Sequence, residues 1–475
     1  MRRLIFVNIL VLISSFSFSQ NIVGNWNGNI NVNGNQIPIV FHFYKDSLGN
    51  LNGRWDSPSQ NAKNLPCSDV DVKADSITIE LKIISGFYNG KFITKDSIAG
   101  MWHQGNGQLA LNISRTNGST FEPPKRPQTP KPPYGYLSED VIYSNADHSM
   151  KYGATFTKPN APLNKKYPAV LLITGSGKQD RDENIFDHKP FAVIADYLTK
   201  RGIAVLRVDD RGMGKTTGNF DTSSSADFAK DVEAGIEYLK SRKDVDVKHI
   251  GLIGHSEGGM IASMVAARDK DVSFIVLLAG TGVSGLVIND YQNTLPMKSA
   301  GMSDILIQKF LDLHHALVNA ATSYLNVGDY KTDVSKIYYD WKKNQSPETL
   351  KALIHGTDEE AIAAFQSRYS LFHSKWWKFF LTHDPAKDIE KLSIPVLALN
   401  GSKDIQVDPK INLPAIESAL KKSKSKNYKK IELPGLNHLF QHCKKCTVDE
   451  YGELEETFAP EALEIMGDWT ENVVK

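Results

Sequence analysis

The hydrophobic pattern of the chain differs on the two sides of residue 120. Before it, short runs alternate apolar and polar residues, as in Ile37–Phe43, Ser76–Ile83 and Leu109–Ile113, which is typical of half-buried strands. Asn-Gly dipeptides recur among these runs and favour the positive φ angles of tight hairpin turns. We therefore expect an antiparallel all-β sandwich or barrel over residues 20–120. The dipeptides begin at Asn27, Asn33, Asn52, Asn89, Asn106 and Asn117.

A proline-rich segment at residues 121–134 follows, and a segment of this composition favours an extended, semi-rigid linker. From residue 135 the pattern changes to near-continuous apolar runs that alternate with helix-like segments, which predicts a mostly parallel sheet covered on both faces by helices. The expected helices include 191–201 and 228–243. The expected strands include 169–173, 203–208, 250–253, 274–278, 394–399 and 428–433.

Residues 285–385 interrupt this alternation with predicted helices at 304–320, 346–354 and 358–368. An insertion at the carboxyl ends of sheet strands lies over the place where α/β proteins bind ligands. We interpret it as a helical cap, inserted into one α/β domain made of residues 135–284 and 386–475.

Composition narrows the classes of function. The 475 residues are 41% hydrophobic and 23% charged, as in globular proteins. The 55 Lys and Arg balance the 54 Asp and Glu, so the chain lacks the basic field of a nucleic-acid-binding protein. No cofactor or metal site is expected.

The first 19 residues have the pattern of a secretory signal peptide. Arg2 and Arg3 precede an apolar run over 4–13, and small residues lead to a cleavage site after Ser19. The run is shorter than the ~20 residues that span a bilayer. We expect a periplasmic or secreted protein without stable membrane insertion. Without Arg2 and Arg3 the charge balance becomes 53 against 54.

Export changes the interpretation of the three cysteines. Cys443 and Cys446 form a C-x-x-C pair, for which a local disulfide is favoured over a zinc site with too few ligands or a thioredoxin-like centre. Cys67 is then left over and is expected to be buried.

The candidate nucleophile lies in Gly254-His255-Ser256-Glu257-Gly258, a G-x-S-x-G sequence. It directly follows the apolar run 250–253 and precedes a helix-compatible run at 259–267. A sharp turn between strand and helix holds the central serine in a strained backbone conformation with an exposed hydroxyl. We therefore predict that Ser256 is a nucleophile rather than a structural turn serine.

A serine nucleophile needs a base, and the base needs an orienting acid. In this fold type the acid and then the histidine follow the serine along the chain. Asp404 and His438 each stand shortly after one of the last two predicted strands, so we assign them as acid and base. The rivals are Asp384 and Asp388, which precede their strand, and His442, which is set back by one helical turn.

The oxyanion needs two backbone N–H donors. The residue after the nucleophile, Glu257, supplies one, and the loop Thr174–Gly177 supplies the other, with Ser176 as the best donor and Gly177 second. This loop lacks the spacing of a phosphate-binding loop, because Lys178 follows too early.

Together these motifs resemble the α/β-hydrolase superfamily, specifically exported bacterial hydrolases related to its serine aminopeptidase-like and dienelactone hydrolase-like branches. The resemblance covers roughly two thirds of the chain. Relatives with an N-terminal β module look like carboxylesterases, which implies esterase activity here. The motifs are Thr174–Gly177, Arg181–Glu183, His188–Ala192 with Asp209–Gly212, Gly254–Gly259, and Asp404 with His438.

The expected function is therefore an exported serine hydrolase that cleaves small carboxylic esters through an acyl-enzyme. One alternative is a serine exopeptidase with the same triad, in which Glu183, Glu257 or Glu359 would bind a free amino terminus. A second alternative is a non-catalytic envelope protein that binds through its β module. The complete Ser-Asp-His order argues against the second.

Overall fold

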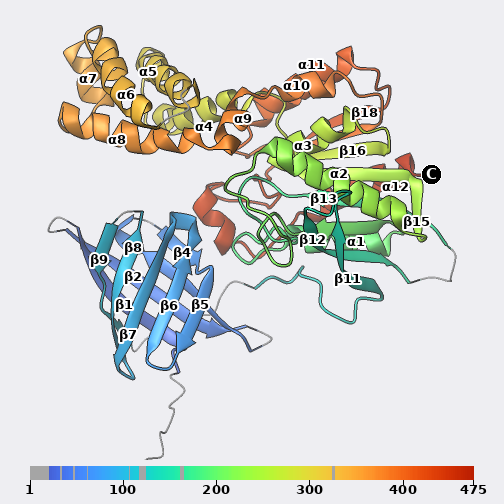
Figure 1. Cartoon of the computed structure of the whole chain (residues 1–475), viewed down its shortest axis with the longest axis horizontal. Helices are drawn as coiled ribbons and strands as arrows, with labels where there is room; N and C mark the ends of the chain where they lie inside the picture. Colours follow the sequence, from blue (N-terminus) through green and yellow to red (C-terminus); the bar gives the residue numbers. More distant parts are fainter. Residues whose placement is uncertain are drawn as a thin grey trace, which may run out of the picture. The chain divides into compact units, whose positions relative to one another are not determined.

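The computed structural model describes residues 21–475 except 33–34, 47–48, 61, 106, 117–124, 161–164 and 324–326. The predicted signal peptide and residues 121–124 of the predicted linker lie outside this part of the chain. The chain divides into two compact units, Met1–Lys125 and Arg126–Lys475 (Figure 1).

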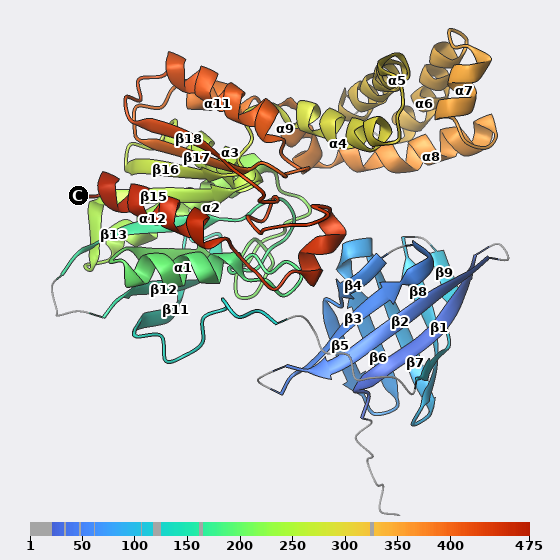
Figure 2. The same cartoon turned by 180° about the vertical axis from the view of Figure 1, so that it is seen from behind.

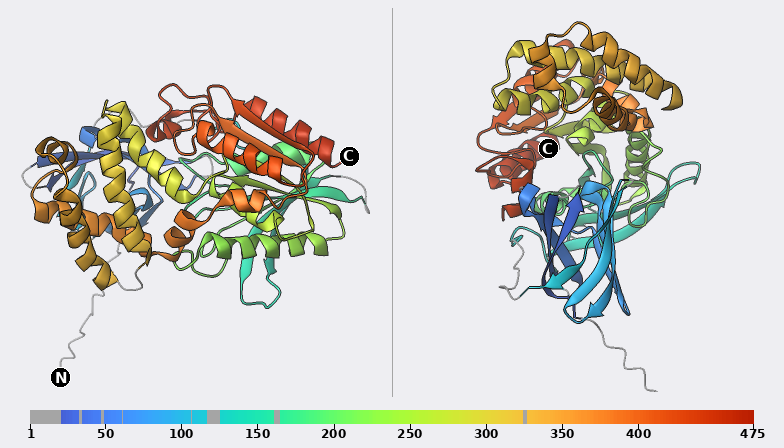
Figure 3. Two further views of the ribbon diagram at one scale, coloured as in Figure 1. Left: turned by 90° about the horizontal axis from the view of Figure 1, so that it is seen from above. Right: turned by 90° about the vertical axis from the view of Figure 1, so that its left-hand side faces the viewer.

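The first unit is one continuous antiparallel sheet that curls strongly, rather than two stacked sheets (Figure 3, right panel). Its strands follow the order β4-β3-β2-β1-β10-β8-β7-β6-β5, with β9 paired to β8. The strands are β1 (Gly24–Val32), β2 (Asn35–Lys45), β3 (Leu51–Ser57), β4 (Ala62–Pro66), β5 (Asp69–Lys73), β6 (Ser76–Leu81), β7 (Gly86–Thr94), β8 (Ser97–Gln104), β9 (Gly107–Ala110) and β10 (Ile113–Arg115).

The concave side of this sheet is filled by large side chains. Trp26, Phe41 and Tyr88 are fully buried, and Trp55 packs edge-on against Trp102 with 5.4 Å between ring centroids. These tryptophans are therefore core residues. The alternation of apolar and polar positions produces this core because successive side chains point to opposite faces of the sheet.

Three of the Asn-Gly dipeptides do not form the turns that the sequence predicts. They lie inside β1, β3 and β7. A Cβ at Gly28 would come within 2.2 Å of the Asn112 carbonyl oxygen, and one at Gly90 within 2.5 Å of Ile98. In a curled sheet, glycine serves close approach of neighbouring groups as well as turns.

The second unit contains an eight-stranded sheet in the order β11-β12-β14-β13-β15-β16-β17-β18. The strands from β14 through β18 along this order run parallel, whereas β11 and β12 pair antiparallel at one edge. The strands are β11 (Tyr136–Ser144), β12 (Lys151–Pro159), β13 (Tyr167–Ile173), β14 (Ala204–Val208), β15 (Val245–His255), β16 (Val272–Leu278), β17 (Val396–Gly401) and β18 (Tyr428–Leu433).

Helices cover both faces of this sheet, as the apolar runs predict. Helices α2, α3 and α11 pack on one face and α1 and α12 on the other, each over its own apolar core (Figures 1 and 2). The helices outside the insertion are α1 (Pro190–Lys200), α2 (Ser225–Ser241), α3 (Glu257–Ala266), α10 (Pro385–Ile389), α11 (Pro409–Lys422) and α12 (Pro460–Val473).

The residues between β16 and α10 form a helical insertion, which we define as α4–α9. Its helices gather together (Figure 3, left panel, yellow to orange) around a core that includes the fully buried Tyr330, Tyr338 and Tyr369. The helices are α4 (Gly285–Ser299), α5 (Asp304–Ser323), α6 (Val327–Lys342), α7 (Pro347–Leu353), α8 (Asp358–Ser370) and α9 (Lys375–Thr382).

A disulfide joins Cys443 to Cys446, as the sequence favours. Cys67 is only half-buried, so the expectation of a buried thiol is wrong. Among the described residues, none of the helices combines the length and the apolar character that a membrane span requires.

Because each unit has its own core, we predict that the units unfold separately. Phe41→Ala removes a fully buried ring from the first unit and should lower its free energy of unfolding by about 3–5 kcal/mol. Leu252→Ala in β15 should lower that of the second unit by about 2–5 kcal/mol. Calorimetry should show two transitions, each shifted by one variant. A single transition that both variants shift would contradict this prediction.

Candidate active site

Ser256 lies at a sharp turn between β15 and α3. Its backbone adopts φ 54° and ψ −118°, a strained conformation for a non-glycine residue, as the G-x-S-x-G sequence predicts. The Ser256 N–H donates to the Leu278 carbonyl oxygen of β16 at 2.8 Å. The serine is therefore held at the carboxyl ends of the parallel strands.

The flanking glycines are required by close contacts. A Cβ at Gly254 would lie 2.1 Å from the Gly258 carbonyl oxygen, and a Cβ at Gly258 would lie 2.2 Å from that of Ile173 in β13. No side chain fits at either position. The turn can therefore be this tight only with glycine on both sides of the serine.

Asp404 and His438 form a buried hydrogen-bonded pair. The distance between His438 Nδ1 and Asp404 Oδ2 is 2.7 Å, and the two residues are 5% and 3% exposed. Asp404 Oδ1 accepts the backbone N–H groups of Gln406 and Val407, both at 2.8 Å, and Oδ2 accepts from the Asn400 amide at 3.0 Å. These donors fix the orientation of the carboxylate toward His438.

The rival residues are engaged elsewhere. Asp384 caps the N-terminus of α10, and Asp388 pairs with His383 and Lys391. His442 is exposed and pairs with Glu456 and Glu461. None of the three takes part in the Asp404–His438 pair.

Ser256, His438 and Ser176 line the same recess. Its empty volume is about 440 Å³, and Gln406 and Tyr451 also contribute to its wall. The four loops that form the recess each follow one strand: β13, β15, β17 and β18. Since parallel strands end at one edge of a sheet, residues far apart in the sequence meet there.

The two predicted oxyanion donors lie near Ser256, since Glu257 follows it in the chain and Ser176 lines the same recess. Glu257 is the first residue of α3, so its N–H has no partner within the helix and adds to the positive end of the helix dipole. Ser176 is exposed in the loop after β13. The neighbouring Gly175 approaches Ser256 closely, since a Cβ there would lie 3.2 Å from the Ser256 Cβ.

A second buried acid–histidine pair supports these loops. Glu183 Oε1 accepts the Gly175 N–H at 2.6 Å and pairs with His255 Nδ1 at 2.9 Å, while His255 Nε2 lies 3.0 Å from the His438 carbonyl oxygen. Burial by itself lowers the pKa of His255, but the Glu183 carboxylate outweighs it and raises the pKa. A protonated His255 donates to both partners. The pair thus links the Gly175 loop to the His438 loop.

The Glu257 side chain is not available to bind the amino terminus of a substrate. It is 2% exposed, and its Oε1 accepts from Ser225 at 2.6 Å and from the indole N–H of Trp376 at 2.8 Å. Burial raises the pKa of this carboxyl. Trp376 belongs to α9, so its hydrogen bond connects the helical insertion to Glu257, the residue that follows Ser256.

Two other groups near the site carry no recognisable sequence signal. Asn400 contacts Asp404, and Tyr451 contacts Gln406. Their roles depend on contacts between distant segments. His255, by contrast, lies within the G-x-S-x-G sequence, and Glu183 lies in a motif that sequence comparison singles out.

Among the described residues, one cluster has the spacing of metal ligands: Cys443, Cys446 and Glu450. The two thiols form the disulfide, and the Glu450 carboxylate accepts backbone N–H groups of residues 444–446. Because these atoms bind one another, the cluster stabilises a loop.

Comparisons with known proteins agree with this geometry. Residues 188–320 match the family described as serine aminopeptidase, S33. The chain is 27% identical to esterase EstD of Thermotoga maritima over 274 residues, which is 58% of this chain and 54% of that protein. It is 25% identical to the uncharacterized protein YfhR of Escherichia coli over 153 residues, or 32% and 50% of the two chains. The chain thus spans about half the length of these curated relatives.

Among solved structures, the chain is similar to the Pyrococcus furiosus esterase PF2001, with 14% identity, coverage of 76% of this chain and 100% of that one, and a TM-score of 0.42. The strand order, the strained serine turn and the matching family lead to one conclusion. The unit Arg126–Lys475 has the α/β-hydrolase fold.

Proposed function

We propose that this chain is a serine esterase in which Ser256 is the nucleophile, His438 the base and Asp404 the orienting acid. The observation that carries the proposal is the buried Asp404–His438 pair, whose histidine lines the same recess as the strained Ser256. The esterase relative supports cleavage of carboxylic esters. Serine hydrolases on unrelated folds use the same three groups in these roles.

In the proposed acylation step, His438 Nδ1–H stays bonded to Asp404, which leaves Nε2 as the acceptor for the Ser256 proton. The Ser256 Oγ attacks the ester carbonyl carbon. The oxygen gains negative charge and accepts from the N–H groups of Glu257 and Ser176. When the C–O bond to the alcohol breaks, the imidazolium returns its proton to the leaving alkoxide.

Deacylation repeats these steps with water. His438 removes a proton from water, the hydroxide attacks the acyl carbon, and the bond to Ser256 Oγ breaks as that oxygen regains a proton. Asp404 stabilises the imidazolium in both halves. Its hydrogen bonds to Gln406, Val407 and Asn400 hold the carboxylate in place.

Export and the helical cap belong to the same proposal. The signal peptide at residues 1–19 would direct the enzyme to the periplasm or the medium, where the Cys443–Cys446 disulfide is stable. The insertion at 285–385 would act as the cap, since its Trp376 binds Glu257 beside the nucleophile. The substrate is a small ester.

A serine exopeptidase is the competing function, because residues 188–320 match a serine aminopeptidase family. Such an enzyme needs a carboxylate that binds the free amino group. Glu183 and Glu257 are buried and bonded to other groups, whereas Glu359 is exposed on α8. We predict that p-nitrophenyl esters are cleaved at least about 100-fold faster than aminoacyl-naphthylamides, a difference of about 2.7 kcal/mol in activation free energy. Faster amide cleavage, lost in Glu359→Gln, would favour the exopeptidase.

Removal of the triad should nearly abolish ester cleavage. We predict that Ser256→Ala and His438→Ala each lower kcat by about 10³- to 10⁶-fold, and Asp404→Asn by about 10³- to 10⁴-fold. The rivals provide matched controls, since His442→Ala and Asp388→Asn should keep kcat within about threefold. Equal losses in His442→Ala and His438→Ala would refute the assignment of the base.

Glu183 should act as a positioning residue. Because it holds both Gly175 and His255, we predict that Glu183→Gln lowers kcat by about 10- to 100-fold with little change in KM, as expected when transition-state contacts are misplaced.

The pH dependence of stability shows whether Glu183→Gln acts through the ion pair with His255 or destabilises the fold in general. The pKa of His255 is raised in the fold, so its ion pair stabilises the protein below pH 6.5 and this contribution disappears as pH rises through the folded pKa. Glu183→Gln should therefore lower the melting temperature more at pH 6 than at pH 9. An equal loss at both pH values would contradict the ion pair.

A further inference from the structure

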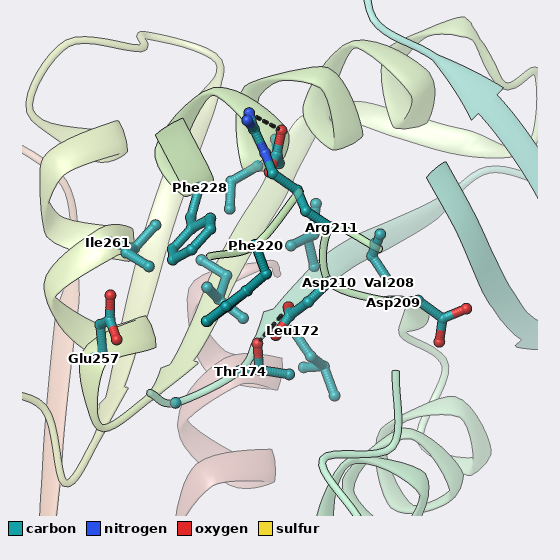
Figure 4. A pocket seen from close by; sticks show the side chains of 15 residues that line it. Leu172, Thr174, Val208, Asp209, Asp210, Arg211, Phe220, Phe228, Glu257 and Ile261 are labelled. Atoms are coloured by element: carbon teal, nitrogen blue, oxygen red, sulfur yellow. Dashed lines mark hydrogen bonds and ion pairs between the residues drawn. The ribbon is translucent and has the colours of Figure 1, made fainter. Parts of the chain in front are cut away.

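A second cavity lies beside the recess that contains Ser256. It occupies the carboxyl ends of β13 and β14 and the space between α2 and α3, with an empty volume of about 550 Å³ (Figure 4). Gly175 lines both cavities, and Glu257, the residue after Ser256, lines the second. The two cavities therefore meet at Gly175, which lies beside Ser256.

The walls of this cavity are mainly apolar. Phe220 and Phe228 stack with 4.9 Å between ring centroids, and Val232 and Ile261 approach from α2 and α3. In Figure 4 the two rings lie between α3 and the segment after β14. Rigid aromatic and branched side chains of this kind favour a compact hydrocarbon group and limit its length.

One side of the cavity is polar. The Asp210 carboxyl accepts from the Thr174 hydroxyl at 2.9 Å and from the Gln179 N–H at 2.7 Å (Figure 4 shows the Thr174 bond). Burial raises the pKa of Asp210 to about 8. The carboxyl is therefore mostly neutral at pH 7 and can donate as well as accept.

We propose that this cavity binds the acyl group of the ester, and that it selects a short acyl chain that carries a hydroxyl group. The inference rests on the esterase proposed above, because it takes the acyl carbon to be bonded to Ser256. The carbonyl oxygen lies at the Glu257 and Ser176 N–H groups. The acyl chain then passes Gly175 and enters the cavity, with its hydroxyl at Asp210.

The chemistry of the polar side favours a hydroxyl over other groups. A hydrocarbon chain would add no hydrogen bond to the two that Asp210 already accepts from Thr174 and Gln179. A mostly neutral carboxyl gives a cation little electrostatic attraction. A hydroxyl group donates and accepts, so it can bind Asp210 in either protonation state.

The size limit is tested with p-nitrophenyl acetate and butanoate. Val232→Phe fills the cavity, and we expect it to lower kcat/KM for butanoate about tenfold relative to acetate, the effect of two buried methylenes. Phe228→Ala enlarges the cavity and should raise the ratio of hexanoate to butanoate. Leu239→Ala is the control, because Leu239 is buried on the same helix outside the cavity. It should lower the melting temperature and leave both ratios unchanged.

The polar side is tested with p-nitrophenyl 3-hydroxybutanoate against butanoate. We expect wild type to favour the hydroxy ester about three- to tenfold, the effect of one neutral hydrogen bond. Asp210→Ala should remove this preference, whereas Asp210→Asn should keep most of it. Asp221→Ala is the control, because Asp221 is exposed in the loop before α2. It should leave the preference for the hydroxy ester unchanged.

Binding of the two acyl groups can also be compared without turnover. Failure of the acyl-site proposal can then be distinguished from failure of the esterase proposal. Ethyl esters of the two acids bind to Ser256→Ala without hydrolysis, and calorimetry should show weaker binding of both when Val232→Phe is added. Ester cleavage by wild type with ratios unchanged by Val232→Phe, Phe228→Ala and Asp210→Ala would overturn the acyl site and leave the esterase standing. Absence of cleavage together with binding unaffected by Val232→Phe would overturn both.

Discussion

The geometry of the candidate active site depends on the strained backbone of Ser256. A residue with φ 54° and ψ −118° persists only where its surroundings leave no alternative. Here the Gly254 and Gly258 backbones pack too closely for any side chain, and the Ser256 N–H is bonded to β16. Two parallel strands and the start of α3 thus fix the serine. Its position at the carboxyl ends of the parallel strands allows the loops after three other strands to reach it.

Electrostatics then orients those loops. Asp404 is buried, but three donors satisfy its carboxylate, so it can hold His438. Glu183 and His255 form a second buried pair whose hydrogen bonds reach the Gly175 loop and the His438 carbonyl oxygen. Buried charges that are paired and hydrogen-bonded specify geometry as well as stability. In our account the first pair serves the chemistry and the second keeps the two loops in register.

Much of this arrangement can be predicted from the sequence because its signals are local. The apolar runs give β13–β18 within a few residues, and a glycine-flanked serine between a strand and a helix predicts the strained turn. Asp404 and His438 follow from their places after strands. The Asn-Gly dipeptides mislead, since the tight space around Gly28 and Gly90 is created by strands distant in the sequence. Contacts such as Asn400 with Asp404 and Trp376 with Glu257 likewise exist only once the chain has folded.

The central claim is that Ser256 is a nucleophile activated by His438. The most direct measurement is labelling of the full-length protein with a fluorophosphonate probe, which reacts with activated serines, followed by mass spectrometry of the modified peptide. The account predicts one modification, on Ser256, that disappears in His438→Ala and persists in His442→Ala. A folded protein that remains unlabelled, or a label on another serine, would contradict it.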